Sequence, residues 1–252
     1  MPQKFFGKYR GKVKSTKDDL NLGRVRVEVP AVLGEGKQSW AMPCVPYAGK
    51  DIGFFTVPPV DSNIWVEFED GNPTYPIWSG CFWGDGELPQ NAKVDKPEEV
   101  QVFRNHGVTF TWSNFGDNKG LTIQVEEPAV QRPLKMVFNA DGIEIDNNDE
   151  TTIKLTADII ELNNRGSSTI TIAKDSIQLK ESSVEIKLTS SSIELINSPA
   201  TIKLTNSNIE SSVTPAKVEI SASGVQIKSG GLGDINVGLA SVNVNNGALE
   251  VT

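Results

Sequence analysis

The residues best suited to chemistry are few and widely separated in this chain of 252 residues. His106 is the single histidine, and no motif such as Gly-x-Ser-x-Gly places a nucleophile beside a partner for it. One histidine and two distant cysteines, Cys44 and Cys81, do not supply the usual ligands of a zinc site. We therefore expect no catalytic residue, metal site or cofactor. His106 should cap a turn or join a core, and both cysteines should be buried free thiols.

Acidic residues suggest two other kinds of site. The segment 146–150 carries oxygen ligands that Ca²⁺ accepts, but it lacks the glycine and spacing of a calcium loop, so a solvated turn is favoured. A polysaccharide-cleaving site would need paired carboxylates in a groove lined with aromatic residues, and Phe138 is the only aromatic residue after Phe115. We interpret the recurring charges as a wet face whose members pair across strands: Glu161, Glu185, Glu194, Glu210, Glu219, Lys154, Lys187, Lys203 and Lys228.

A short pattern positions these charges: an apolar residue, a polar residue, a second apolar residue, then a polar run. Every second unit repeats at steps of 16 or 17 residues, which gives about eight residues for each strand and turn. The apolar members should share one buried face. They are Ile143, Ile145, Ile153, Leu155, Ile160, Leu162, Ile170, Ile172, Ile177, Leu179, Ile186, Leu188, Ile193, Leu195, Ile202, Leu204, Val218, Ile220, Val225, Ile227, Ile235, Val237, Val242 and Val244.

Strands this short cannot bury enough surface alone, so neighbouring units must stack. The two-unit period fits no three-sided coil of a single chain. We therefore expect residues 143–252 to form an intertwined trimeric β-helix, a triangular prism in which three chains add strands in turn and the apolar pairs fill the axis.

The composition of the N-terminal part differs from that of the repeats. Four of the five tryptophans and both cysteines precede residue 90. Short alternating runs with almost no helical periodicity predict an OB-type barrel over residues 1–87. Residues 88–142 are expected to be a connector with short strands that leads into the shaft. The predicted barrel strands are Phe5–Lys14, Arg24–Leu33, Ser39–Pro46, Phe54–Pro59, Asn63–Glu69 and Tyr75–Trp83.

The charge and hydropathy of the chain argue against nucleic acid or a membrane as a stable partner. The net charge is -8, and the first 94 residues carry equal numbers of basic and acidic side chains, so no basic stripe is available for nucleic acid. No apolar stretch near Met1 is long enough for a signal peptide, and no segment approaches a membrane span. The chain is expected to be made and assembled in the cytoplasm of the producing cell.

The segment Gly53–Gly84 carries the features of a known family. It contains a Pro58-Pro59 turn, the strand Asn63-Ile64-Trp65-Val66-Glu67-Phe68-Glu69, the turn Asp70-Gly71-Asn72-Pro73 and a strand with Gly80 near its end. This order, with Gly23-Arg24-Val25-Arg26-Val27 before it, resembles the OB-fold domain of contractile-tail spike proteins. The family includes phage baseplate assembly protein V, the central spike of type VI secretion and the spikes of extracellular contractile injection systems. Phe103–Phe110 resembles the entry to the prism in such spikes.

The resemblance implies a structural, non-enzymatic, homotrimeric spike of a phage tail or injection-system baseplate. The OB-fold end would meet the hub and tail tube proteins, and the shaft would puncture a target membrane, touching it only on firing. Some relatives end in an iron-binding His-x-His pair, which this chain lacks. A tip protein of the PAAR class is therefore expected to cap its end. The residues expected to bind this tip are Leu249, Val251 and Thr252.

Two other functions remain open from the sequence. One is a trimeric tailspike that degrades surface polysaccharide, which would require an aromatic-lined groove. The other is an OB-fold that binds single-stranded nucleic acid on a trimeric stalk, in which the aromatic residues would stack on bases.

Overall fold

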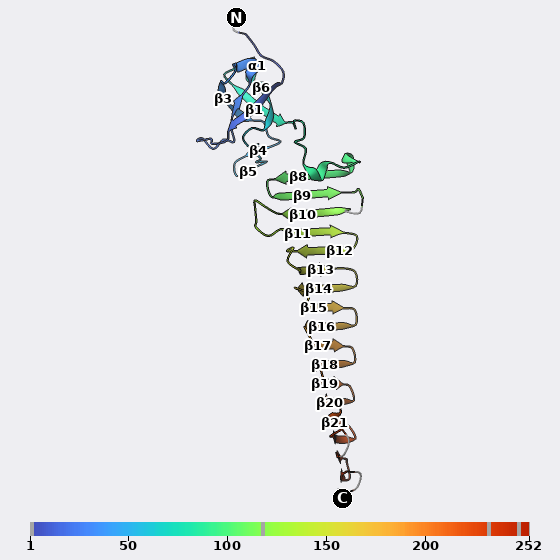
Figure 1. Cartoon of the computed structure of the whole chain (residues 1–252). Helices are drawn as coiled ribbons and strands as arrows, with labels where there is room; N and C mark the ends of the chain where they lie inside the picture. The colour runs from blue at the N-terminus through green and yellow to red at the C-terminus, as the bar shows by residue number, and fades with distance from the viewer. Residues whose placement is uncertain (1–2, 117–118, 231–232, 246–247, 252) are drawn as a thin grey trace. The chain divides into compact units, whose positions relative to one another are not determined.

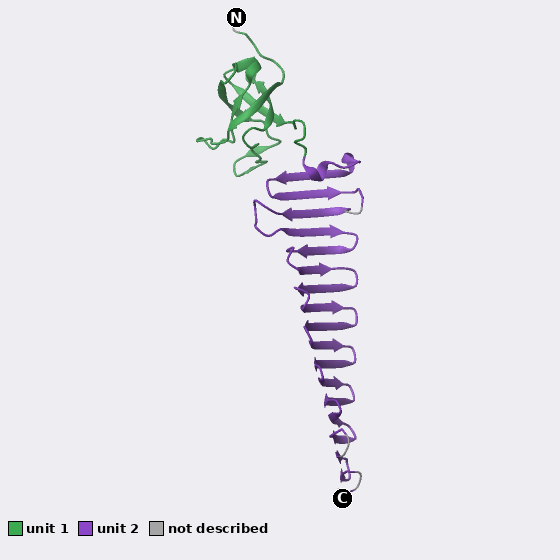
Figure 2. Ribbon diagram, in the orientation of Figure 1, with its two compact units in different colours: residues 1–88 green, residues 89–252 purple. Residues whose placement is uncertain are grey.

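The computed structural model describes residues 3–116, 119–230, 233–245 and 248–251. The chain divides into two compact units, Met1–Leu88 and Pro89–Thr252 (Figure 2), which are described separately. Strands dominate both units (Figure 1), so the prediction of an all-β chain is confirmed. In the part of the chain that the structure describes, no helix has the length and apolar character needed to cross a membrane.

Five strands close a barrel in the first unit, in the order β1-β2-β3-β7-β6. β3 and β7 pair in parallel, and the other neighbours pair antiparallel. The prediction of an OB-type barrel is therefore confirmed. The strands are β1 (Tyr9–Ser15), β2 (Val25–Glu28), β3 (Gln38–Pro43), β6 (Asn63–Phe68) and β7 (Pro76–Cys81).

Alternate residues of the strands fill this barrel. Val25 and Val27 in β2 are fully buried, whereas Arg26 between them is exposed. The same period of two places Ile64 and Val66 of β6 inside. The buried apolar core consists of Val13, Val25, Val27, Val29, Ala41, Ile64, Val66, Phe68 and Trp78.

Two predictions of barrel strands are wrong: one predicted strand is too long, and the other does not form. The strand predicted over Arg24–Leu33 ends at Glu28, because Pro30 begins the short helix α1 (Pro30–Leu33), where the fixed φ of proline suits the first position. Phe54–Pro59 forms no strand, and the hairpin of β4 (Ala48–Gly49) and β5 (Ile52–Gly53) precedes it. Glu69–Gly71 is a single turn of 3-10 helix, η1.

The second unit is one long antiparallel sheet, the strand ladder, after two 3-10 turns, η2 (Gln90–Ala92) and η3 (Pro97–Glu99). Its strands follow one another along the sheet in sequence order (Figure 1). They are β8 (Val100–Asn105), β9 (Val108–Ser113), β10 (Gly120–Val125), β11 (Leu134–Asn139), β12 (Gly142–Asp146), β13 (Thr151–Leu155), β14 (Ile159–Asn164), β15 (Ser168–Ala173), β16 (Ser176–Glu181), β17 (Val184–Thr189), β18 (Ser192–Asn197), β19 (Ala200–Thr205), β20 (Asn208–Val213), β21 (Ala216–Ser221), β22 (Gly224–Lys228), β23 (Asp234–Val237), β24 (Val242–Val244) and β25 (Leu249–Val251).

The eight-residue period follows from the strand and turn lengths. From β15 to β21 each strand has six residues. Turns of two residues, such as Lys174-Asp175 and Ser182-Ser183, join them. A two-residue turn can connect only antiparallel neighbours in the same sheet.

The pairing adds a feature that the sequence prediction lacked. Neighbouring strands of the ladder belong to one chain, as in the pairing of β16 with both β15 and β17. We had expected neighbouring strands to come from different chains in turn. The two-residue turns explain the difference, because they leave no room for a strand from another chain between two consecutive strands. β8 to β11 pair within the same sheet as β12 to β25. The division of the chain into a connector over residues 88–142 and a shaft after it stays a prediction.

Candidate functional site

Two continuous columns of apolar side chains run along one face of the strand ladder. In the first column, Ile153 lies opposite Leu162, which lies opposite Ile170, and this register continues strand by strand. In the second column, Leu155 lies opposite Ile160, which lies opposite Ile172. Residues two apart in a strand point to the same face. Both columns therefore lie on a single surface, which we call the apolar face.

The registers place every residue predicted for the trimer core on the apolar face, one pair in each strand from β12 to β24 except β20, which holds none of them. Ser211 interrupts the first column between Ile202 and Val218. Packing of these residues against other chains stays a prediction.

The apolar face also extends toward β8, beyond the predicted core. Phe110 lies opposite Ile123, and Trp112 lies opposite Leu121. The columns then continue through β11, where Phe138 lies opposite Ile143. The sequence predicts a connector with short strands over these residues. The continuous register joins them to the same surface.

The apolar face lies open in the single chain. Ile153 and Ile193 are 44% and 45% exposed, whereas the valines of the barrel core are 0% exposed. Monomeric proteins rarely leave contiguous apolar patches of more than a few hundred Å² uncovered. A surface that continues through so many strands is therefore a candidate interface.

A third column borders the apolar face, and its composition changes along the ladder. Thr151, Asn164, Ser168 and Glu181 occupy it from β13 to β16, and Val184 follows in β17. The Thr151 hydroxyl donates a hydrogen bond to Asn164 Oδ1 over 3.0 Å, and the Ser168 hydroxyl donates one to the Glu181 carboxylate.

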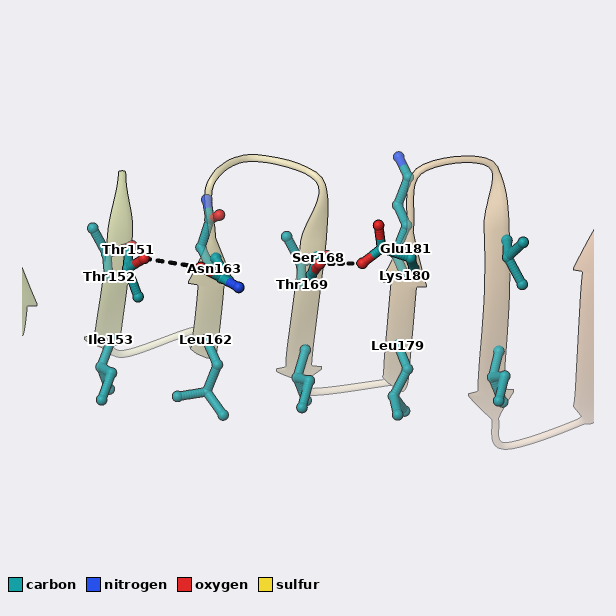
Figure 3. A pocket seen from close by; sticks show the side chains of 14 residues that line it. Thr151, Thr152, Ile153, Leu162, Asn163, Ser168, Thr169, Leu179, Lys180 and Glu181 are labelled. Atoms are coloured by element: carbon teal, nitrogen blue, oxygen red, sulfur yellow. Dashed lines mark hydrogen bonds between the residues drawn. The ribbon is translucent and has the colours of Figure 1, made fainter. Parts of the chain in front are cut away.

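A shallow hollow of about 500 Å³ lies along this third column. Figure 3 shows Ile153, Leu162 and Leu179 in a row beside the two hydrogen-bonded contacts of the third column. The hollow combines an apolar side with a polar margin that holds one carboxylate, so it can receive a side chain with an apolar stem and a polar end.

Comparison with protein families assigns the barrel. Residues 9–83 match the family model described as the type VI secretion system/phage-baseplate injector OB domain. The barrel is similar to this OB domain, and we call it the injector OB domain. The resemblance to contractile-tail spike proteins is confirmed on this ground, and the match covers about a third of the chain. No curated protein matches the chain.

The loop between the first two strands of the injector OB domain is held by hydrogen bonds to one carboxylate. The Asp18 carboxylate accepts hydrogen bonds from Arg24 Nε and Nη2 at 2.9 and 2.6 Å, and from the backbone amides of Leu20, Leu22 and Arg24. The Arg24 guanidinium, followed by these amides, holds the pKa of Asp18 well below its usual range. Asp18 therefore organises this loop.

Arginine side chains lie against several aromatic rings of the injector OB domain. Arg24 and Arg26 lie 5.1 and 5.7 Å from the centre of the Trp40 ring. Arg10 lies 4.9 Å from that of Phe82. These rings are in contact with cations of their own chain, and stacking on bases would have to displace the guanidinium groups.

The opposite face of the strand ladder carries the charged residues, as the wet-face interpretation predicted. Lys203 lies 2.8 Å from Glu194 across β18 and β19, and this lysine is the main cause of the lowered pKa of Glu194. Glu210 and Glu219 lie directly opposite each other in register, an arrangement that is unfavourable for like charges. Lys217 lies 3.0 Å from Glu210 and 2.6 Å from Glu219. Lys217 thus offsets the repulsion, lowers the pKa of Glu219 and has a raised pKa of its own.

The residues considered for chemistry lie apart from one another. His106 occupies the turn between β8 and β9 with a φ of 49°, and its Nδ1 is 2.7 Å from Asn105 Oδ1. Asp149 in the 146–150 segment pairs with Arg132 and Arg165. Among the described residues, no group of three or more His, Cys, Asp or Glu side chains could hold a metal ion.

The expectation that both cysteines are buried is wrong, because Cys44 and Cys81 are exposed. Cys44 follows the end of β3, and Cys81 is the last residue of β7, so neither occupies an inward position within a barrel strand.

The predicted tip-binding residues lie at the C-terminal end of the ladder. Leu249 is 59% exposed. Val251 is the last residue of β25, which pairs with β24. Thr252 lies outside the described residues. Binding of a tip protein here stays a prediction.

Proposed function

We propose that this chain is a structural, non-enzymatic central spike in the baseplate of a contractile phage tail or contractile injection system. One observation carries the proposal: an injector OB domain is followed by a strand ladder whose apolar face lies open along its length. Three copies, each supplying one sheet, would turn these faces toward a common axis and form a triangular prism. This arrangement gives every copy the same buried environment.

The prism explains how the spike would transmit force. Every strand between β8 and β25 is hydrogen-bonded to a neighbour on each side within its own chain, and association would add the burial of the apolar columns. The injector OB domain would join the hub and tail tube proteins. The shaft would carry the thrust of contraction into a target membrane, which it would touch only on firing.

The end of the ladder would be capped by a separate tip protein of the PAAR class. Among the described residues, β24 is the strand that pairs with β25, so the other edge of β25, with exposed Leu249, offers an apolar side chain and backbone groups to a partner. A partner that adds strands to this edge and covers Leu249, Val251 and Thr252 would satisfy both. The assembled particle would form in the cytoplasm of the producing cell.

The oligomeric state tests this proposal. Sedimentation velocity of the full chain should give the mass of a trimer, because the open apolar face has to be covered. A monodisperse folded monomer would exclude the spike.

Two substitutions on adjacent residues of β18 test which face is buried. Leu195→Asp places a charge on the apolar face of each copy and should abolish the trimer. Glu194→Ala removes contacts with Lys203 and Ser192 on the opposite face and should leave the trimer intact. Equal effects of both changes would show that the trimer does not use the apolar face.

A further inference from the structure

The two edges of the strand ladder carry opposite charges beside β16. One edge contains the turns that follow the even-numbered strands, and it is bordered by Glu181 at the end of β16. Arg165, in the turn after β14 on this edge, pairs with Asp149 of its own chain. The other edge contains the turns that follow the odd-numbered strands, with Asp158 after β13 and Lys174-Asp175 after β15.

Lys174 and Glu181 are each unusual in their position. In the third column from β13 to β21, Glu181 is the single carboxylate. In the turns of the opposite edge from β13 to β22, Lys174 is the single cation. They flank the same strand, β16, which is six residues long. A strand of that length spans about 20 Å, so these two side chains cannot pair within one chain.

We propose that Lys174 of one copy pairs with Glu181 of the next copy and so sets the axial register between copies. The inference rests on the proposed trimer. In a ring with rotational symmetry, each contact joins one edge of a sheet to the opposite edge of its neighbour. Equivalent strands lie at the same height around the axis. The edge with Lys174 therefore meets the margin with Glu181 at the level of β15 and β16.

The hollow beside Glu181 suits this contact. Its apolar side, with Leu162 and Leu179, can receive the methylene stem of Lys174, while the carboxylate at its margin pairs with the ammonium group. Asp175 adjoins Lys174 in the turn, but its side chain is shorter, so the lysine reaches further from the backbone.

Without such a contact the register would be poorly defined. The two apolar columns repeat with each pair of strands, so a slip of two strands, about 10 Å, would preserve most of the apolar packing. A slip in one direction moves Glu181 to the level of Asp158, which brings like charges together. A slip in the other direction moves Glu181 to the level of Ser190 and Ser191, where it loses its cationic partner. The pair thus disfavours the two nearest wrong registers.

Charge reversal tests the pair in the full chain. Lys174→Glu and Glu181→Lys should each lower the Tm of the trimer by about 5 °C, since three repulsive contacts form in each assembly. The double variant, which exchanges the two charges, should recover most of that loss. Additive losses without recovery would overturn the pairing.

Chemical crosslinking tests the register independently. In a background with Cys44→Ser and Cys81→Ser, Lys174→Cys with Glu181→Cys should give crosslinked trimers on a denaturing gel after treatment with a short bismaleimide. The reagent's arm replaces the length of the lysine and glutamate side chains, which a direct disulfide cannot span, and the two sites are too far apart to be joined within one chain. The matched control, Ser190→Cys with Glu181→Cys, represents a slip of one repeat and should not crosslink. Crosslinking of the control alone would overturn the proposed register.

The two proposals fail in different ways. If the unmodified chain sediments as a monomer, the proposed spike fails and the pair fails with it. If it sediments as a trimer that neither crosslinks through 174 and 181 nor recovers on charge exchange, the spike stands and the register contact is wrong.

Discussion

At the scale of single residues, Asp18 shows how one buried carboxylate organises a loop of the injector OB domain. Its side chain is 6% exposed and pairs with Arg24, whose guanidinium also lies 5.1 Å from the centre of the Trp40 ring. The same carboxylate accepts three backbone amides of the loop. The Asp18 carboxylate therefore connects the loop to Arg24, and through Arg24 to the Trp40 ring.

Replacing Asp18 with Asn should lower the Tm of the injector OB domain by several degrees at pH 7, because the charged acceptor is lost. The folded pKa of Asp18 is depressed, so its contribution is present above the unfolded value of about 4 and is lost as the pH falls below it. The difference in Tm between the wild type and the variant should therefore shrink between pH 5 and pH 2. Tryptophan fluorescence melts at several pH values would measure it.

Asp19→Asn is the matched control, because Asp19 is the next residue and is exposed. Its Tm should stay close to that of the wild type at every pH. Equal losses in the two variants would mean that net charge, rather than the contacts of Asp18, stabilises the loop.

At the scale of elements, the repeating unit of the ladder is a pair of strands. In β17 the residues of the apolar face are the first, third and fifth, whereas in β18 they are the second, fourth and sixth. Residues of the apolar face lie opposite one another in neighbouring strands only when these two kinds of strand alternate. This explains why the sequence pattern repeats every 16 residues and why the two interleaved sets of strands differ in sequence.

Two deletions should therefore have opposite outcomes. Removing residues 192–207 takes out β18, β19 and their turns, so β20 follows β17 with the correct phase, and a shorter trimer should assemble. Removing residues 192–199 takes out β18 alone, so every later strand turns its isoleucines to the charged face. We expect this smaller deletion to aggregate or bind the dye ANS strongly. Sedimentation velocity and ANS fluorescence would distinguish the two variants, and equal assembly of both would contradict the two-strand unit.

The same elements show how far the sequence could lead. The alternation of Val25 and Val27, or of Ile193 and Leu195, follows directly from the period of two, so the barrel and both apolar columns could be predicted. The end of β2 depended on Pro30, which suits a helix start as well as a strand boundary. The pairing of neighbouring strands within one chain was also readable, from two-residue gaps such as Lys174-Asp175, but a period alone does not say which chain supplies the next strand.

At the scale of the whole molecule, the apolar face of one chain is a surface that the proposed trimer would cover. The apolar face obeys the rules of a buried core yet is half exposed in the single chain. The third column, which contains Glu181, could be recognised only from the strand register. The register also shows that Glu181 and Lys174, seven residues apart in the sequence, lie at opposite ends of β16. The sequence pattern indicates an apolar surface that a partner could cover. The charges at the edges of the strand ladder indicate how another copy of the chain would fit there.

The last prediction concerns the end of the assembly, where the three copies of β25 would meet. Leu249→Asp, or deletion of residues 246–252, should abolish capture of a PAAR-class tip protein encoded beside this chain, because the change removes the apolar patch that the tip would cover. The trimer should persist, since the columns from β12 to β24 remain. Leu239→Asp is the matched control: Leu239 is 94% exposed in the turn after β23, so its replacement should leave capture unchanged. Co-purification of the tip with each variant measures the outcome, and capture that survives both changes at the C-terminus would place the tip elsewhere.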